Sequence, residues 1–491
     1  MKKLAAKLPG PAVFVLLSVL ASCVVNPVTG QKEFNIISEA MEIQMGQETD
    51  VSIREEYGIY DDRALNAYVE AIGRRMVPFT HRPNLPYHFA VLDTPVENAF
   101  AAPGGYIYVT RGMLALMNDE AALAAIIGHE LGHVNARHTA RAMSRQLLML
   151  GGILVASALS EDIAKIAPFA MIGLQVLSLK YSRDDEYQAD SLGVQYSRKA
   201  GWAPGQIVPL FGTFLRMEQS GGGPSLPNFL STHPLTTRRI EEIDKMLLPT
   251  DPGQRVARND YLNRVNGLVF GANPRQGYVE GGAFYHPDMQ FMMRIPAGWK
   301  YQNSPKQFVM APEDEKAGVF LTAETSAQDL SVYMKEKLAA FKESQVKELS
   351  RGSQWINGLS AWRGLYDIRP KVQADQATQE DQGTPMTVDI RCIRKGGQIF
   401  TFLSTTASET FRSYEGAIDG AIRSFQTLTE PDKLNRRAWR LGLQGARRGE
   451  TLKSILVRAK IDQKLWKAHE LMNGLSVDMA IDADRQLKIL R

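Results

Sequence analysis

Apolar residues recur with mainly helical spacing between residues 35 and 250. Ser38 is the expected N-cap of an early helix in this stretch. A later helix is expected to begin at Asp119, because acidic side chains suit the positive end of a helix dipole. Between these helices, residues 87–92 and 106–109 have the pattern of strands. The pattern predicts a mainly helical first domain that contains a few strands.

The pattern changes near residue 278, where apolar and aromatic strands surround an amphipathic helix. Strands are predicted at 291–295, 319–322, 387–393 and 399–404, and helices at 330–348 and 409–425. This arrangement predicts an α+β domain with a small antiparallel sheet over residues 278–430. Cys392 is expected to be a small buried residue in one of its strands. The basic stretch at 436–491 is expected to form a separate small domain.

The first 22 residues have the pattern of an export signal, with three lysines ahead of a short apolar run at 12–20. Such a run is too short to cross a hydrocarbon core of about 30 Å as a helix. It ends in Leu-Ala-Ser-Cys, which resembles the lipobox of bacterial lipoproteins and predicts lipidation of Cys23 as the mature N-terminus. Val24 replaces the aspartate of the usual inner-membrane retention signal. We therefore expect an outer-membrane anchor facing the periplasm of a Gram-negative bacterium.

Two further apolar stretches, at 146–159 and 166–179, are also too short to span a membrane. We expect buried helices or a hydrophobic lid over a cleft. Insertion into a membrane surface is the alternative.

Composition narrows the class of protein. The chain is 44% hydrophobic and 22% charged, as globular proteins are, and its 491 residues suit two to four domains. Because the net charge is only +4 and no basic helix is present, nucleic acid is not expected as a partner.

The strongest chemical motif is His-Glu-Leu-Gly-His at residues 129–133, inside the helix that begins at Asp119. Residues four apart share a helix face, so His129 and His133 can direct two imidazoles at one metal ion. Glu130 lies beside the first histidine, from where its carboxylate can reach a water at the metal. Two ligands plus a general base are the pattern of zinc peptidases.

A catalytic zinc is expected to have a third protein ligand. The metzincin arrangement does not fit, because Thr139 stands at its third histidine position and Ala136 at its glycine position. His138 is one residue short of that position. The alternative is a glutamate on a second helix, and Glu186 offers one. Asp190 lies four residues later on the same face, where it can accept the spare N–H of a ligating histidine.

This combination resembles the HtpX-like and CAAX-prenyl-protease-like zinc metallopeptidases (peptidase family M48), which belong to the gluzincins. Four segments match in order, and the chain from Cys23 looks like the mature start of the family's bacterial lipoproteins. The four segments are 98–105, 129–138, 186–190 and 231–234, the last followed by Arg239. The resemblance covers residues 23–250 or so and implies a gluzincin metallopeptidase domain over 23–255.

The resemblance also implies roles for individual residues. One zinc ion would have three protein ligands, which are His129, His133 and Glu186. Glu130 would be the catalytic base. His233 would stabilise the tetrahedral oxyanion or cover the zinc at rest. Arg239 would pair with Asp190 or a neighbouring carboxylate, and His138 would support the site or pack on the helix without binding metal.

The segment before the active-site helix is small and glycine-rich, so an extended peptide could pair with its backbone by strand addition. The residues expected to contact substrate are Ala99, Phe100, Ala101, Gly104 and Gly105. Because backbone pairing reads little sequence, we expect an endopeptidase that favours unfolded chains.

The tail at 436–491 loosely resembles a LysM module, a small β-α-α-β unit that binds glycans containing N-acetylglucosamine. The resemblance implies peptidoglycan as a partner. A degenerate interaction module is the alternative.

Together these features predict a zinc metalloendopeptidase of the cell envelope that cleaves unfolded or misassembled proteins. The rival hypothesis is a peptidoglycan-attached scaffold or chaperone whose metal site regulates binding more than cleavage. A membrane-embedded prenyl-protease relative is disfavoured, because no span of about 20 apolar residues follows the signal.

Overall fold

The computed structural model describes residues 23–154, 181–219, 228–339, 344–370 and 385–491. The predicted signal peptide at 1–22, the apolar stretch at 166–179 and the end of the stretch at 146–159 lie outside the described residues. The chain divides into two compact units. Unit 1 combines the chain up to Gly271 with Trp439–Arg491, and unit 2 is Ala272–Ala438.

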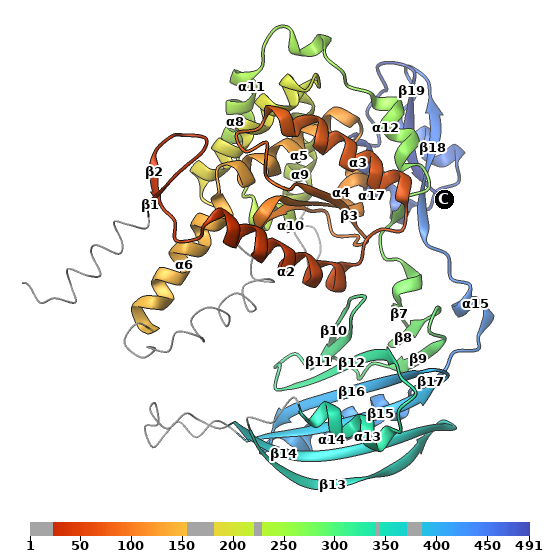
Figure 1. Cartoon of the computed structure of the whole chain (residues 1–491). Helices are drawn as coiled ribbons and strands as arrows, with labels where there is room; N and C mark the ends of the chain where they lie inside the picture. Colours follow the sequence, from red (N-terminus) through yellow and green to blue (C-terminus); the bar gives the residue numbers. More distant parts are fainter. Residues whose placement is uncertain (1–22, 155–180, 220–227, 340–343, 371–384) are drawn as a thin grey trace, which may run out of the picture. The chain divides into compact units, whose positions relative to one another are not determined.

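Unit 1 is built around helix α5 (Glu120–Asn135), every residue of which is buried. A three-stranded sheet of order β3-β5-β4 packs on it, with β3 and β5 parallel and β4 antiparallel at one edge. Figure 1 shows the other helices gathered around α5 and this sheet. The mainly helical character predicted for the region is confirmed.

The elements of unit 1 that precede the tail have the following bounds. The strands are β1 (Cys23–Val25), β2 (Lys32–Phe34), β3 (His88–Leu92), β4 (Ala99–Ala102), β5 (Tyr106–Thr110) and β6 (Val269–Phe270). Besides α5, the α-helices are α2 (Glu39–Tyr57), α3 (Arg63–Met76), α4 (Arg111–Leu116), α6 (His138–Leu154), α8 (Arg183–Lys199), α9 (Ile207–Gln219), α10 (Asn228–Thr232), α11 (Thr237–Met246) and α12 (Arg258–Val265).

Local sequence signals fix where the site-bearing helices begin. The Ser38 side chain accepts a hydrogen bond from the Met41 amide at the start of α2, as predicted. Asp119 accepts from the Ala122 amide at the start of α5, and the helix begins where it was predicted to begin. At the start of α8, Ser182 and Asp185 cap each other's backbone amides in a capping box.

The C-terminal tail is part of unit 1. Its elements are β18 (Trp439–Ala446), α16 (Leu452–Arg458), α17 (Trp466–Asn473) and β19 (Arg485–Leu490). Strand β18 pairs antiparallel with both β19 and β6. Lys488 of β19 is fully buried, and its ammonium group donates to the carbonyls of Ala115 (2.6 Å) and Met117 (2.5 Å). The tail expected to stand apart therefore packs into the core of the first unit, through contacts between residues more than 370 positions apart.

Unit 2 contains a seven-stranded antiparallel sheet of order β10-β11-β12-β16-β15-β14-β13 and a four-stranded sheet of order β17-β9-β8-β7. Helix α13 packs on β14 and β15, and α14 packs on β16 and β9. The consecutive residues Cys392 and Ile393 belong to different core clusters, so the two helices cover opposite faces of the large sheet. Cys392 is buried in β15, as predicted.

The elements of unit 2 have the following bounds. The strands are β7 (Tyr278–Glu280), β8 (Ala283–His286), β9 (Phe291–Arg294), β10 (Lys300–Asn303), β11 (Phe308–Ala311), β12 (Ala317–Thr325), β13 (Ser344–Ile356), β14 (Leu359–Pro370), β15 (Met386–Lys395), β16 (Gln398–Ala407) and β17 (Gln426–Thr427). The helices are α13 (Leu330–Leu338), α14 (Phe411–Arg423) and α15 (Pro431–Leu434).

Two predictions for unit 2 are wrong. The sheet is large, not small, and the helix predicted at 330–348 ends at Leu338. The chain continues as the 13-residue strand β13, which pairs along its length with β14. Gln345, Lys347 and Glu348 are good helix formers, but pairing with a long neighbouring strand outweighs this local preference.

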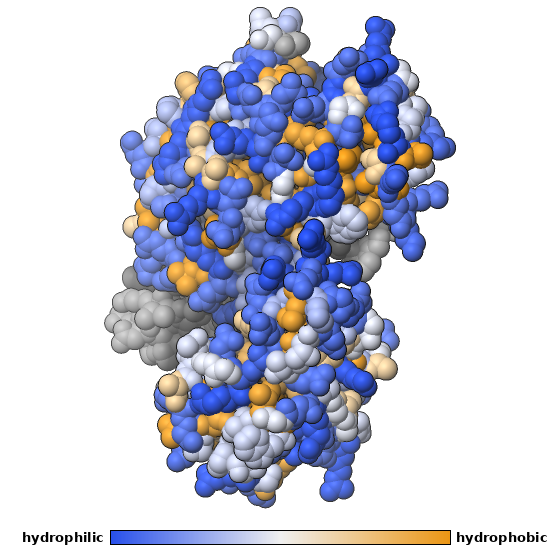
Figure 2. All heavy atoms as spheres, turned by 90° about the vertical axis from the view of Figure 1, so that its right-hand side faces the viewer, coloured by the Kyte–Doolittle hydropathy of each residue, from blue (hydrophilic) through white to orange (hydrophobic). Residues whose placement is uncertain are grey.

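No helix in the part of the chain that the structure describes combines the length and hydropathy needed to cross a membrane. The large apolar side chains gather in core clusters inside each unit. Figure 2 shows that hydrophilic residues predominate on the face it displays, with apolar residues in patches between them.

Candidate metal centre

Two closely packed helices carry the motif residues. Helix α5 carries His129, Glu130 and His133, and α8 carries Glu186. The helices approach closely because glycines lie where they cross. A Cβ atom at Gly193 of α8 would lie 2.9 Å from the backbone nitrogen of His129, which leaves no room for any larger residue. This close approach brings the glutamate within reach of the histidines.

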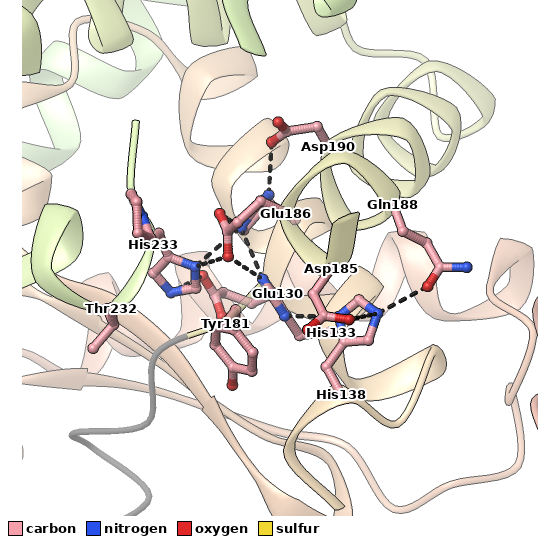
Figure 3. A network of polar contacts seen from close by, with 12 residues as sticks. Glu130, His133, His138, Tyr181, Asp185, Glu186, Gln188, Asp190, Thr232 and His233 are labelled. Carbon is pink, nitrogen blue, oxygen red and sulfur yellow. Dashed lines mark hydrogen bonds and ion pairs between the residues drawn. The ribbon is translucent and has the colours of Figure 1, made fainter. Parts of the chain in front are cut away.

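Four side chains direct one ligand atom each toward a common point, as Figure 3 shows for three of them. They are His129, His133, Glu186 and His233, and their ligand atoms all lie within 4.8 Å of one another. The Nε2 atoms of His129 and His133 are 3.0 Å apart, and Oε1 of Glu186 lies 3.4 Å from Nε2 of His133. All four side chains are at most 1% exposed. Three imidazoles and one carboxylate form a donor set that suits zinc.

The hydrogen bonds around the two motif histidines fit a cation at this point. Nδ1 of His129 lies 2.9 Å from the carboxylate of Asp190, so this nitrogen carries the proton and Nε2 is left with a lone pair. Nδ1 of His133 lies 2.9 Å from Nδ1 of His138, which can accept its proton. Both Nε2 atoms then present lone pairs to each other at 3.0 Å. Two such lone pairs repel unless a cation binds both.

Asp190 and Arg239 stabilise the ligand residues through buried hydrogen bonds and ion pairs. The guanidinium group of Arg239 binds Asp190 through Nε and Nη2, both at 2.7 Å, and Glu186 through Nη1 at 2.6 Å. All three side chains are at most 2% exposed. Arg239 thus fixes two carboxylates at once, one beside His129 and one in the ligand set.

His138 lies next to the cluster but outside it. Its Nδ1 faces His133, and its Nε2 lies 2.8 Å from the side-chain oxygen of Gln188. With His138 donating to Gln188, its Nδ1 is an acceptor, which orients the His133 ring with Nε2 toward the cluster. Figure 3 shows this chain from Gln188 through His138 to His133.

His233 and Tyr181 cover the other side of the cluster. His233 lies with Nδ1 3.0 Å from Glu186 and Nε2 3.7 Å from the carboxylate of Glu130. Among the residues that the structure describes, neither Glu130 oxygen nor Nε2 of His233 has a hydrogen-bond partner, and all three atoms are buried. The Tyr181 ring packs on His133 with centroids 4.0 Å apart. A buried carboxylate that accepts no hydrogen bond is costly unless it acts on a ligand.

The residues expected to contact substrate lie at one edge of the small sheet. Ala99, Phe100 and Ala101 belong to β4, the edge strand, which pairs with β5 on one side only. Gly104 and Gly105 follow in a turn with φ of 74° and 97°, where other residues would be strained. Strand β4 packs against α5, so its edge lies beside the motif helix.

Residues 63–247 match the model of the family described as peptidase family M48. These residues include every member of the four-residue cluster and Glu130. We call residues 63–247 the M48 domain, after the family to which they are similar. Within it the metal site is intact, with the His-Glu-x-x-His motif on α5 and the additional glutamate on α8.

Relatives of the M48 domain include named proteases. The beta-barrel assembly-enhancing protease of Escherichia coli (strain K12) is 28% identical over 224 residues, which cover 44% of this chain and 46% of that protein. The mitochondrial metalloendopeptidase OMA1 of Schizosaccharomyces pombe is 30% identical over 229 residues, covering 45% of this chain and 65% of that one. The chain thus spans about half the length of the bacterial relatives it matches.

The chain is only weakly similar to solved structures. Cyanobacterial PsbP from Synechocystis covers 31% of this chain and 98% of its own, with 14% identity and a TM-score of only 0.24.

Burial and neighbouring charges set the protonation of the M48 site. Burial raises the pKa of the Glu130 carboxyl group, and the nearby His233 offsets only part of this effect. Burial would also raise the pKa of Glu186, yet His233, His133 and Arg239 lower it well below its ordinary value. Burial lowers the pKa of His133. Glu186 is therefore a carboxylate and His133 a neutral imidazole, which are the forms that bind a cation.

Sequence analysis did not single out Tyr181, Gln188 or Gly193 of the M48 domain. Gln188 lies inside the matching segment 186–190, so its place on α8 beside Glu186 was a usable signal. Gly193 lies seven residues after Glu186 on the same helix, where it marks a close helix contact. For Tyr181, no local pattern indicates that its ring covers His133.

Proposed function

We propose that this chain is a zinc-dependent endopeptidase that hydrolyses peptide bonds of unfolded or misassembled proteins in the cell envelope. The observation that carries this proposal is the buried cluster of His129, His133, Glu186 and His233, with the buried carboxylate of Glu130 beside it at 3.7 Å from His233. A zinc ion there would supply Lewis acidity, which lowers the pKa of water and polarises a carbonyl group.

The residues of the chain would perform the proton transfers. Glu130 would take the proton of the attacking water and deliver it to the leaving amine, the role of a general base that then acts as an acid. Its raised pKa suits it to hold that proton between the two steps. His233 would donate to the oxyanion through Nε2, which makes no hydrogen bond to the described residues, or would cover the metal at rest.

The edge of β4 would hold the substrate. An extended polypeptide could add to this three-stranded sheet beside α5, with its scissile bond over Glu130. Main-chain pairing of this kind selects for an unfolded, extended chain and not for a particular sequence.

The direct test is digestion of unfolded casein by the full-length chain, purified in detergent and loaded with zinc. Glu130→Gln should lower the cleavage rate by about 10²–10⁴-fold while zinc remains bound. Glu241→Gln, an exposed glutamate on α11, is the matched control and should cleave like the wild type. A zinc-loaded wild type that leaves casein intact would reject the proposal and favour the scaffold or chaperone.

The cellular location is also proposed. We infer that Cys23 carries lipid and anchors the chain at the outer membrane, facing the periplasm. The lipobox-like sequence supports this, as does similarity to a bacterial protease named for β-barrel assembly. Mass spectrometry of the mature N-terminus should find acyl groups on Cys23, and Cys23→Ser should move the protein from the membrane to the soluble fraction. An unmodified N-terminus would contradict the anchor.

A second role, peptidoglycan binding by the tail, is favoured by one observation. A groove of about 1230 Å³ opens beside the turn after β18, lined mostly by polar side chains that include Asn259, Gln444 and Gln486. The full-length chain should sediment with insoluble peptidoglycan, and Asn259→Leu with Gln444→Leu should reduce this binding. Lys467→Leu, outside the groove, is the control. Equal sedimentation of all three would assign the groove no role in glycan binding.

A further inference from the structure

The first described residues of the chain contact the helices that surround the metal centre. Residues 23–34 form the hairpin of β1 and β2, here called the N-terminal hairpin. Asn26, which is 3% exposed, donates through its side-chain amide to the Glu33 carboxylate at 3.0 Å. The same amide lies 3.4 Å from the carbonyl of Ala136, at the end of the motif helix α5. The hairpin therefore contacts α5 three residues beyond His133.

Arg141 of α6 links this hairpin to α8. Its Nη1 donates to Glu33 at 2.7 Å, and its Nη2 forms an ion pair with Asp185. Arg141 is 15% exposed, Glu33 24% and Asp185 10%, so solvent screens these pairs only in part. One guanidinium group thus joins the N-terminal hairpin to the first turn of the helix that carries Glu186.

Asp185 connects Arg141 to residues around the ligand His133 through two sets of contacts. Its carboxylate lies 3.5 Å from Nε2 of His138, the residue that faces Nδ1 of His133. It also accepts the Ser182 amide in the capping box, which fixes the backbone directly after Tyr181. Both His138 and Tyr181 contact the imidazole of His133.

We propose that Arg141 is a positioning residue for the metal centre, which fixes His138 and thereby His133, and that the N-terminal hairpin is a structural part of that centre. The proposal rests on the zinc site of the proposed function. Groups that orient a metal-binding histidine without touching the metal commonly contribute 10–100-fold to affinity. Arg141 would act in this way although it contacts no ligand itself.

The test measures zinc affinity of the full-length chain by competition with a chromogenic chelator. Arg141→Met keeps the aliphatic stem and removes both ion pairs, and it should weaken zinc binding about 10–100-fold. Arg145→Met, an exposed arginine one turn further along α6, is the matched control and should change affinity less than about 2-fold. Glu33→Gln breaks only the hairpin side of the link and should give a smaller loss.

A double-mutant cycle separates positioning from general stability. If Arg141 acts through His138, then Arg141→Met should have little further effect on zinc affinity in a His138→Ala background. The absorption spectrum of the cobalt-substituted protein should change in Arg141→Met and not in Arg145→Met. Unchanged zinc affinity, or full additivity with His138→Ala, would overturn the inference. Arg141→Lys and Glu33→Gln carry the same test if Arg141→Met does not fold.

Failure of this inference is distinguishable from failure of the proposed function. A wild type that neither binds zinc nor cleaves casein would reject the function itself. A wild type that does both, with an Arg141→Met variant of equal affinity, would reject only the role of Arg141.

Discussion

Arg239 should be one of the most costly residues of unit 1 to replace. Its guanidinium group makes three short contacts to two carboxylates, Asp190 and Glu186, in a site where each side chain is at most 2% exposed. It also lies 5.2 Å from the ring centre of Phe211. In Arg239→Met, both carboxylates would remain buried without their cation.

The expected loss follows from this geometry. Removing one partner of a buried ion pair costs about 3–5 kcal/mol, because an uncompensated charge stays in the interior. Arg239→Met affects two such carboxylates, so we expect the upper part of this range for the free energy of unfolding of the zinc-free protein. The neighbouring Arg238 is exposed and lies 5.8 Å from the ring centre of Tyr187. Arg238→Met should cost less than about 1 kcal/mol.

The assay must separate the two units, because a chain with two compact units does not unfold as one two-state system. Hydrogen exchange of α5 and α8 peptides at increasing urea concentrations, in the presence of a chelator, reports unit 1 alone. If Arg239→Met loses no more stability than Arg238→Met, the charge network described above does not stabilise the site.

Three further changes test other parts of the structure. Gly193→Ala should cost about 1–3 kcal/mol by overpacking and weaken zinc binding, because its Cβ would lie 2.9 Å from the His129 nitrogen. Gly416→Ala, in α14 of unit 2 with open space around it, should leave the stability of unit 1 and the zinc affinity unchanged in the same denaturation and chelator assays. Burial lowers the pKa of His286 from 6.5 to about 4, so the unfolded chain binds an extra proton between these values. Stability of unit 2 in urea should therefore fall by about 3 kcal/mol from pH 7 to pH 4, and His286→Phe should remove this dependence. Zinc at 100 times its dissociation constant should add about 2.7 kcal/mol to unit 1, so a chelator should lower its calorimetric melting temperature and leave unit 2 unchanged.

The parts of the fold that the sequence predicted are those governed by local patterns. The cap at Ser38 and the start of the motif helix at Asp119 depend on residues within one or two turns, and both appear as expected. The strand β13 depends instead on pairing with β14, although residues near its start, such as Lys347 and Glu348, favour a helix. The place of the tail depends on Lys488 reaching the carbonyl of Ala115. Such distant contacts leave no periodic trace in the sequence.

In the candidate site, too, local features could be predicted from the sequence and contacts between distant segments could not. His129 and His133 lie four residues apart on one helix. Because this spacing is local, the sequence was enough to predict that both lie on one face. The meeting of Glu186 with them depends on two helices crossing at Gly193, and the glutamate was indicated by the chemistry of zinc together with the family resemblance. The full burial of the cluster could not be predicted, because it depends on how separate segments pack over α5.

This burial has a consequence for the proposed substrate. Glu130 and His233 have no exposed surface, so a polypeptide can reach them only if residues packed on them move, and Phe229 of α10 stacks on His233 with ring centroids 4.6 Å apart. Backbone hydrogen bonds between described residues that join α10 to its surroundings run from the Phe229 amide to the Glu97 carbonyl (3.3 Å) and from the Tyr181 amide to the Thr232 carbonyl (3.4 Å).

Opening the site must also expose Phe229, which is fully buried. The two hydrogen bonds contribute about 1 kcal/mol each, and burial of the phenyl ring about 2 kcal/mol. A total of about 4 kcal/mol corresponds to an open population of about one in 10³. A substrate must offset this cost by pairing with β4, and each extended residue adds main-chain contacts. Peptides of about twelve residues should therefore give a much higher kcat/KM than tetrapeptides with the same scissile bond, and equal values would show that opening is not limiting.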